Sequence, residues 1–208
     1  MYTKAVYVVI DCLAIIDLII VLTALRRVSE KYSKWLRLTL ISGIVAIIAN
    51  ILIAISPSAF SAEISYCLYF ASIDWILLFL WGFCLSYTEH FIALRRLTIP
   101  AGILMLVDTV SILLNPIFGH HFTIYETRNQ FGIVFFQTSA RSPYYFHLAL
   151  DYVTIAIALS FILFRIFKSY SLYRLKYLMI LLVLLFVLFL NVLYMAFHLA
   201  LDASVVEQ

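Results

Sequence analysis

The chain contains few charged residues. Of its 208 residues, 12% are charged and 65% are hydrophobic, whereas roughly 25% of the residues in an ordinary soluble domain are charged. A soluble fold of this size could not bury so much apolar surface, so the composition excludes an ordinary soluble domain and predicts that lipid surrounds much of the chain. The net charge of +3 is too small to indicate nucleic-acid binding.

Glycine, proline and cysteine are also scarce. With 5 glycines and 4 prolines the chain has no low-complexity linker. The 3 cysteines (Cys12, Cys67 and Cys84) lie in apolar stretches, and their odd number and isolation exclude a disulfide framework and a cysteine metal site. The sequence has no nucleophile elbow and no phosphate-binding glycine loop, so we expect neither enzymatic activity nor a cofactor in this chain.

Long apolar stretches dominate what is present. A membrane-spanning helix needs about 20 mostly apolar residues. Because backbone polar groups must pair internally in lipid, and because the alternation of a membrane barrel is absent, these stretches predict helices. We therefore expect an all-α membrane protein with a single polytopic domain over residues 1–208 and six spans, at about 5–25, 36–55, 62–87, 99–114, 144–167 and 177–201.

The distribution of basic residues predicts the orientation of these spans. The first, third and fifth connections carry 11 of the 14 lysines and arginines, and such residues accumulate on the cytoplasmic side. Both termini are therefore expected outside. The positive charge follows the first apolar stretch, which favours a retained helix over a signal peptide. We expect a multi-pass protein of a bacterial cytoplasmic membrane, with the lipid bilayer as its main partner.

The fourth connection, residues 115–143, is the only long segment predicted outside the membrane. Residues 121–126 and 131–136 are rich in strand-forming residues, and residues 127–130 between them are turn-like. This pattern predicts a β-hairpin over the outer mouth of the bundle.

Ionisable residues within the spans are the candidates for a binding site, because charge is costly in a bilayer and usually faces the bundle interior. His147 precedes Asp151 by one helical turn, so both lie on one helix face. Asn191 and His198 are seven residues apart and nearly share a face. The predicted ligand-binding set, mostly in the outer half of the membrane, is Asp74, Trp75, Asp108, Asn115, Tyr144, Tyr145, His147, Asp151, Asn191, Tyr194 and His198.

The chemistry of this set predicts a ligand class. Acidic and aromatic walls without basic partners favour a small molecule that is cationic or donates hydrogen bonds. In the alternative, structural interpretation, each buried Asp takes up a proton and bonds a neighbouring helix. We predict no metal site, because adjacent His120 and His121 would not easily point at one ion and no ligand spacing supports it.

The order of several short motifs resembles a known family. These motifs are Asp74-Trp75, Asn115-Pro116, the GHHFTI segment of residues 119–124, Gly132-Ile133, the SPYYFH segment of residues 142–147 and the NVLY segment of residues 191–194. Together they resemble the N-terminal seven-helix sensor region found ahead of bacterial histidine kinases and diguanylate cyclases.

The resemblance implies a sensory function. It implies that a ligand is detected from outside and that helix movement relays the signal to a cytoplasmic kinase or cyclase domain; a cyclase would link the chain to cyclic di-GMP. The implied protein partner is such a signalling domain or a second copy of the chain in a homodimer. With six predicted spans, the seventh helix and the output domain are missing, so we expect either a fragment of a longer receptor or a stand-alone relative.

Two other functions remain open at this stage. One is a small-solute transporter or the substrate-binding membrane subunit of a transporter. Transporters often contain broken helices rich in Gly and Pro, whereas Gly43, Gly82 and Gly102 are isolated here. The other is an accessory membrane protein without a ligand.

Overall fold

The computed structural model describes residues 2–26, 31–88, 95–128, 134–168, 170, 174–175, 177–182, 184–185 and 189. The chain divides into two compact units, Met1–Ala158 and Leu159–Gln208. The first unit holds most of the described elements and all the candidate site residues that lie within the described ranges.

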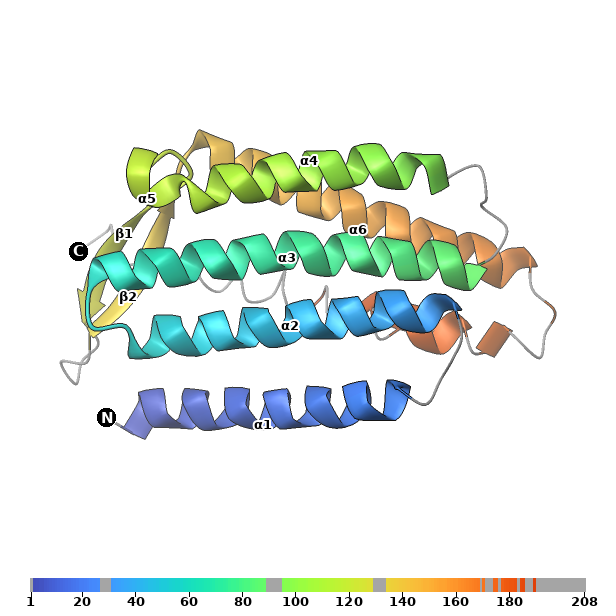
Figure 1. The fold of residues 1–208 in the computed structure, drawn as a ribbon, viewed down its shortest axis with the longest axis horizontal. Coiled ribbons are helices and arrows are strands. Elements are labelled where there is room, and N and C mark those ends of the chain that lie inside the picture. The colour runs from blue at the N-terminus through green and yellow to red at the C-terminus, as the bar shows by residue number, and fades with distance from the viewer. Residues whose placement is uncertain are drawn as a thin grey trace. The chain divides into compact units, whose positions relative to one another are not determined.

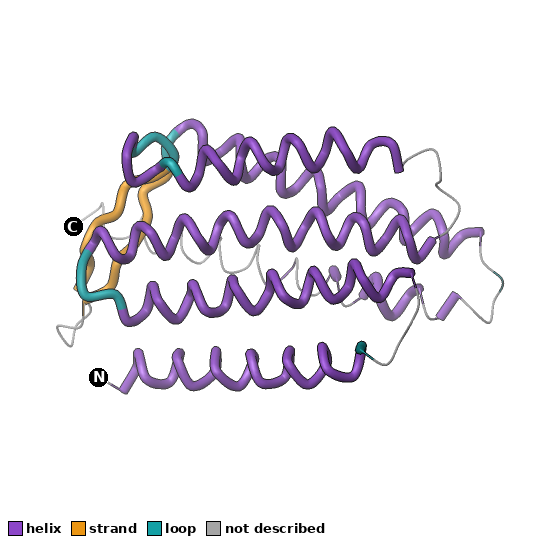
Figure 2. The backbone as a smooth tube through the Cα atoms, in the orientation of Figure 1, coloured by secondary structure: helices purple, strands orange, loops and turns teal. Residues whose placement is uncertain are grey.

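The described elements are mainly long helices, with one small sheet (Figures 1 and 2). In chain order they are α1 (Tyr2–Leu25), α2 (Lys31–Ile55), α3 (Ala59–Thr88), α4 (Arg95–Leu113), α5 (Asn115–Phe118), β1 (Phe122–Arg128), β2 (Val134–Ala140) and α6 (Ser142–Lys168).

Four helices are long and apolar enough to cross a membrane. They are α1, α2, α3 and α6, and the segment Thr98–Leu113 of α4 is a shorter apolar helix. At about 1.5 Å per residue, the 24 residues of α1 span about 36 Å, which exceeds the roughly 30 Å hydrocarbon core of a bilayer. The prediction of a mainly helical membrane protein is therefore confirmed. Most of the sixth predicted span lies outside the described residues.

The fourth helix extends beyond its predicted span. The span expected at about 99–114 agrees with the apolar segment Thr98–Leu113, but α4 itself begins at Arg95 and contains Pro100 within it. Proline removes one backbone hydrogen bond and usually ends a helix in water. Spanning helices tolerate this loss because neighbouring groups compensate for it.

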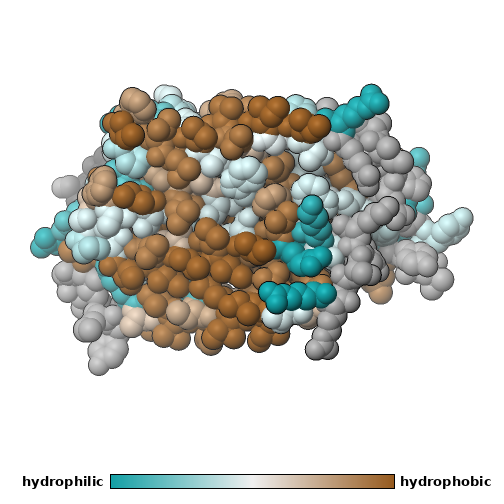
Figure 3. All heavy atoms as spheres, viewed as in Figure 1, coloured by the Kyte–Doolittle hydropathy of each residue, from teal (hydrophilic) through white to brown (hydrophobic). Residues whose placement is uncertain are grey.

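Large apolar side chains cover the outer surfaces of these helices. Along α1, Val6, Ile10, Leu13 and Ile20 are each at least 56% exposed. In the face drawn in Figure 3, brown apolar side chains occupy the middle, and teal polar side chains lie toward the ends. Exposed apolar surface of this extent is stable in lipid rather than in water.

Helix α3 is the central element of the first unit. It packs along α2 on one side and α4 on the other, and α1 packs against α2 (Figure 2). Gly82 allows the closest part of this packing, because an added Cβ there would meet the indole ring of Trp35 on α2, with its Cζ3 at 2.8 Å. Between α1 and α2, the Asn50 amide donates to the Asp11 carboxylate at 2.9 Å.

The predicted hairpin is confirmed as a two-stranded antiparallel sheet. Its register runs from Phe122 opposite Ala140 to Arg128 opposite Val134, and the turn between the strands lies outside the described residues. The short helix α5, which the sequence did not predict, leads into it. Gly119 ends α5 in the left-handed region at φ 58°, a conformation that favours glycine.

The hairpin is attached to the helices by an apolar contact and by hydrogen bonds. Phe122 is fully buried against Cys67 of α3 and Ile112 of α4. The Tyr66 hydroxyl on α3 donates to the Phe136 carbonyl oxygen at 2.8 Å. The sheet therefore lies against one end of α3 and α4.

In the second unit, the end of α6 contacts the residues that follow it. Within it the guanidinium of Arg165, near the end of α6, lies 5.8 Å from the ring centroid of Tyr177 and donates to its hydroxyl at 3.3 Å. Phe161 and Ile162 are buried. The basic residues Arg165 and Lys168 occupy the last turn of α6.

Candidate functional site

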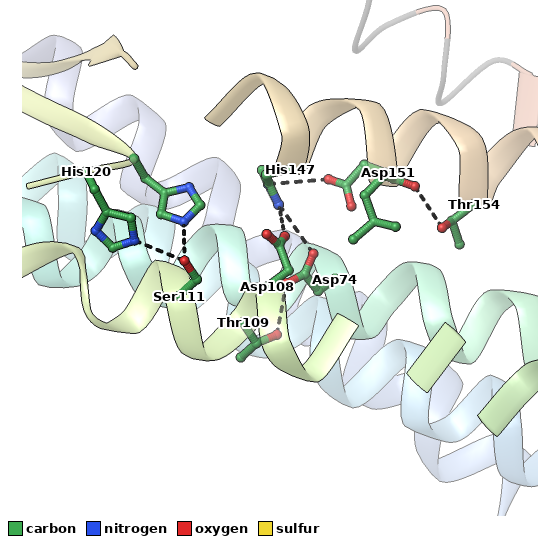
Figure 4. Close-up of polar contacts among 10 residues, drawn as sticks. Asp74, Asp108, Thr109, Ser111, His120, His147, Asp151 and Thr154 are labelled. Atoms are coloured by element: carbon green, nitrogen blue, oxygen red, sulfur yellow. Dashed lines mark hydrogen bonds and ion pairs between the residues drawn. The ribbon is translucent and has the colours of Figure 1, made fainter. Parts of the chain in front are cut away.

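Four ionisable residues from three helices meet inside the first unit (Figure 4). Nδ1 of His147 on α6 lies 2.7 Å from Oδ2 of Asp108 on α4 and 3.4 Å from Oδ1 of Asp74 on α3. Its other ring nitrogen, Nε2, lies 3.5 Å from Oδ2 of Asp151, one turn further along α6. We call Asp74, Asp108, His147 and Asp151 the carboxylate–histidine cluster.

The three helices bring these side chains together through the apolar residues beside them. Leu77 and Leu78 of α3 and Met105 of α4 form a buried group, and Leu150 and Ile155 of α6 pack against it. Asp74, Asp108 and His147 lie roughly one helical turn from these contacts. Helix packing therefore fixes the distances within the cluster.

The cluster is almost completely shielded. Relative exposures are 0% for Asp74, 4% for Asp108, 1% for His147 and 9% for Asp151. Both ring nitrogens of His147 face carboxylate oxygens, as in a doubly protonated imidazolium. One imidazolium balances only one of the three carboxylates, and uncompensated charge is costly in a buried site. The cluster therefore needs additional protons or another positive group.

One carboxylate is oriented by a hydroxyl, but its other oxygen makes no hydrogen bond. The Thr109 hydroxyl of α4 donates to Oδ2 of Asp74 at 2.9 Å. Oδ1 of Asp74, which faces His147, is buried without a hydrogen-bond partner, as is Oδ1 of Asp151. Buried unsatisfied oxygens are uncommon, so the cluster has unused capacity to accept a donor or a cation.

Further polar residues extend from the cluster toward the hairpin along α4 and α5. Ser111 lies about one turn after Asp108 on α4, and Asn115 begins α5 after the turn at Leu114. The Ser111 hydroxyl lies 3.0 Å from Nε2 of His120 and 2.9 Å from Nε2 of His121. We predicted that the two adjacent histidines would not converge, and that expectation was wrong, because both rings point at one hydroxyl.

His121 lies outside the spanning helices and is buried. Burial, reinforced by the neighbouring His120, lowers the pKa of His121 from its ordinary 6.5. Its neutral form is therefore favoured in the folded chain.

Asn115 connects the hairpin to the helices. Its amide nitrogen donates to Oε1 of Glu63 at 2.8 Å and to the Phe122 carbonyl at 3.0 Å. Its amide oxygen accepts from the backbone N–H of His121 at 2.7 Å and of Phe122 at 3.2 Å. Asn115 thus fixes the start of β1.

The structure separates the predicted site residues into groups. Asp74, Asp108, His147 and Asp151 come together, and the Tyr144 ring lies 5.9 Å from the His147 ring. Asn115 contacts the hairpin instead. The Trp75 ring packs against Phe79 at 5.7 Å and against the Leu77 group. Tyr145 is 63% exposed, facing away from the site. Asn191, Tyr194 and His198 lie outside the described residues.

The sequence analysis missed several members of the polar region. Ser111 and Thr109 carry no signal by themselves, although Ser111 lies one turn after Asp108. Glu63 was overlooked although it is a charged residue within an apolar stretch, which is the signal that identified the aspartates.

The comparison with protein families supports the resemblance. A family model described as the N-terminal seven-transmembrane region of histidine kinase matches residues 6–205. No curated protein matches the chain closely. The match covers nearly the whole chain, and it includes the helices that carry the carboxylate–histidine cluster. The chain therefore belongs to the family of N-terminal seven-transmembrane regions of histidine kinases.

Proposed function

We propose that this chain is a ligand-sensing membrane module in which the carboxylate–histidine cluster is the detection site. The ligand is a small solute from the extracytoplasmic side, cationic or able to donate hydrogen bonds. The response is a rearrangement of α3, α4 and α6 that is relayed to a cytoplasmic kinase or cyclase domain. Family membership supports the sensory role, and the site and its ligand are our proposal.

One observation carries the choice of site. A buried histidine on α6 bridges carboxylates on α3 and α4, with 2.7 Å and 3.4 Å between the paired atoms. Ionisable residues in spanning helices are costly and commonly mark functional sites. A packing role alone would be served by a simple amide or hydroxyl pair.

The position of the cluster suggests how a ligand would act. A ligand shifts a conformational equilibrium only if it binds two arrangements with different affinity. One imidazole makes a hydrogen bond to Asp108 of α4 and an ion-pair contact with Asp74 of α3, so a ligand that competes for either carboxylate changes the contact that holds α6 to that helix. The polar residues Ser111 and Asn115, which follow Asp108 toward the hairpin, support access from that end.

A stability screen tests this proposal. The purified chain in lipid nanodiscs is heated in the presence of a library of small cationic and hydrogen-bond-donating solutes. We expect at least one solute to raise the unfolding temperature of the wild type but not of His147→Ala or Asp151→Asn. Asp11→Asn, at the α1–α2 contact, is the control that keeps the response.

Two outcomes contradict the proposal. If every stabilising solute acts equally on the wild type and on both cluster variants, then the cluster is not the binding site. If the cluster variants insert and fold normally and the wild type responds to no solute, the accessory role without a ligand is favoured.

A further inference from the structure

We propose that the ligand of the carboxylate–histidine cluster is a divalent first-row transition metal ion of the Zn²⁺ type, held by Asp74, Asp108 and Nδ1 of His147. This inference deepens the proposed function, because it names the ligand class of the same site. It also replaces our expectation from sequence that the chain has no metal site.

The donor geometry supports a metal ion. One donor atom from each of Asp74, Asp108 and His147 lies within 4.8 Å of the other two. In a tetrahedral zinc site with bonds of about 2.0–2.2 Å, neighbouring donors lie about 3.3–3.5 Å apart. The 3.4 Å between Nδ1 of His147 and Oδ1 of Asp74 already has this value. The 2.7 Å to Oδ2 of Asp108 is a direct hydrogen bond that would open by about 0.6 Å when the ion replaces the proton.

The hydrogen bonding of Asp74 also supports a metal ion. Oδ1 of Asp74 belongs to a residue that is 0% exposed, lies 3.4 Å from Nδ1 of His147 and makes no hydrogen bond. A fully buried carboxylate oxygen without a donor is unfavourable. A metal ion between Oδ1 and the imidazole nitrogen would satisfy it.

The residues around the three donors match the outer shell of a metal site. Histidine ligands usually donate their second ring N–H to a carboxylate, and ligating carboxylates are themselves hydrogen-bonded. Asp151 lies 3.5 Å from Nε2 of His147, and Thr109 donates to the second oxygen of Asp74 at 2.9 Å. These partners contact Nε2 of His147 and Oδ2 of Asp74, so Nδ1 and Oδ1 remain as the donor atoms for the proposed ion.

Charge balance favours a dication. With a neutral imidazole, the carboxylates of Asp74 and Asp108 balance Zn²⁺, so the three ligands and the ion are neutral together and Asp151 is the one carboxyl group of the cluster left to take up a proton. Binding releases the proton from Nδ1. Imidazole ligation favours a transition metal over Ca²⁺ and Mg²⁺, which prefer all-oxygen sites.

The direct test is metal binding to the purified full chain in nanodiscs, with any affinity tag removed. Zn²⁺ titration by calorimetry should give one site per chain. His147→Ala and Asp108→Asn should weaken binding at least about 100-fold. Thr109→Val and Asp151→Asn act through the outer shell, so they should weaken it about 10- to 100-fold. His120→Ala and His121→Ala, which alter the other histidine pair, should leave the affinity unchanged.

A spectroscopic measurement on the wild type identifies the metal ligands without relying on variants that could fail to fold. X-ray absorption of the Zn²⁺-loaded wild type should show a single imidazole with oxygen donors. Two imidazoles would place the ion at His120 and His121 and overturn the inference, as would the absence of stoichiometric binding.

Failure of this inference and failure of the proposed function can be distinguished. If Zn²⁺ does not bind but another solute stabilises the chain in a His147-dependent way, the metal inference is wrong and the sensing site stands. If Zn²⁺ binds with a single imidazole but leaves the helix arrangement unchanged by distance measurements, the metal site stands and the sensory role is wrong.

Discussion

At the scale of residues, Asn115 links the hairpin to the membrane helices. Its amide makes four hydrogen bonds, to Glu63, His121 and twice to Phe122, while being 0% exposed. Each buried partner left unsatisfied costs about 1–3 kcal/mol. The order of β1 therefore depends on this one side chain.

We predict that Asn115→Ala releases the start of β1. Amide exchange at His121 and Phe122 should accelerate by at least about 10-fold, because their N–H groups lose the acceptor. Hydrogen–deuterium exchange measures this directly, and Thr127 in the same strand serves as the internal comparison. Unchanged exchange at both amides would show that the Asn115 amide does not hold the strand.

His121 makes the stability of the chain depend on pH. Its pKa is lowered by burial from 6.5, and His120 and His147 act in the same direction while Asp108 opposes them. The unfolded chain therefore binds the proton first, so stability is lost as the pH falls through the ordinary value.

We predict that the unfolding temperature falls between about pH 7.5 and about pH 5.5, and falls less in His121→Gln. The glutamine can still bond to Ser111 but does not titrate. The difference between the two proteins separates His121 from the other ionisable groups. Parallel pH profiles would contradict this role for His121.

Ionisable residues inside apolar stretches made much of the candidate site predictable from the sequence. Asp74, Asp108 and Asp151 stood out because charge is rare in a span, and the spacing of His147 and Asp151 predicted their shared face. The sequence could not show that Tyr145 faces outward and Tyr144 inward, because both sides of the start of α6 are apolar or aromatic. The convergence of His120 and His121 on Ser111 depends on backbone geometry at α5 that no sequence pattern indicated.

At the scale of elements, Gly82 of α3 lies in tight contact with Trp35 of α2. Glycine usually lowers helix stability by about 1 kcal/mol relative to alanine. Here the absence of a side chain lets the indole lie against the backbone of α3. Small residues commonly serve this purpose between membrane helices.

We predict that Gly82→Ala destabilises the chain by about 1–3 kcal/mol, because overpacking outweighs the gain in helix propensity. Gly102→Ala on α4 is the matched control, since a Cβ there would lie 3.7 Å from Leu78, an ordinary contact. Gly102→Ala should be neutral or slightly stabilising. Thermal unfolding in nanodiscs compares them, and equal stability of the two variants would mean that the indole moves aside.

Sequence patterns predicted these elements better than their ends. The apolar stretches predicted α1, α2, α3 and α6, and the strand-forming residues predicted the hairpin. Helix α4 begins at Arg95, before the apolar stretch that predicted its span, because a helix can continue past the apolar segment into charged residues. The pairing of α3 with both α2 and α4 could not be predicted, since helices that are apolar on all sides do not reveal which face meets a neighbour.

At the scale of the whole molecule, orientation in the membrane determines what the sensor can detect. Basic residues occupy the beginning of α2 and of α4 and the last turn of α6, whereas the hairpin follows the opposite end of α4. The positive-inside rule therefore predicts that the hairpin lies outside the cell.

We predict that a membrane-impermeant maleimide labels Tyr125→Cys on β1 in intact cells, and labels Lys34→Cys on α2 only after permeabilisation. Both substitutions are made in a Cys12→Ser background, because Cys12 is the exposed native cysteine among the described residues. The opposite labelling pattern would reverse the orientation and exclude extracytoplasmic detection at this end of the bundle.

The central claim is that the carboxylate–histidine cluster controls how the helices are arranged, and distance measurement by pulsed electron paramagnetic resonance tests it most directly. Spin labels at Lys34 on α2 and Ile99 on α4, with the native cysteines replaced, report the spacing at the end of the bundle away from the hairpin. Asp108→Asn, which removes the charge that His147 binds at 2.7 Å, should shift this distance by about 1–2 Å or broaden it. Asp11→Asn should change nothing. An identical distance distribution in the wild type and in Asp108→Asn would contradict the account.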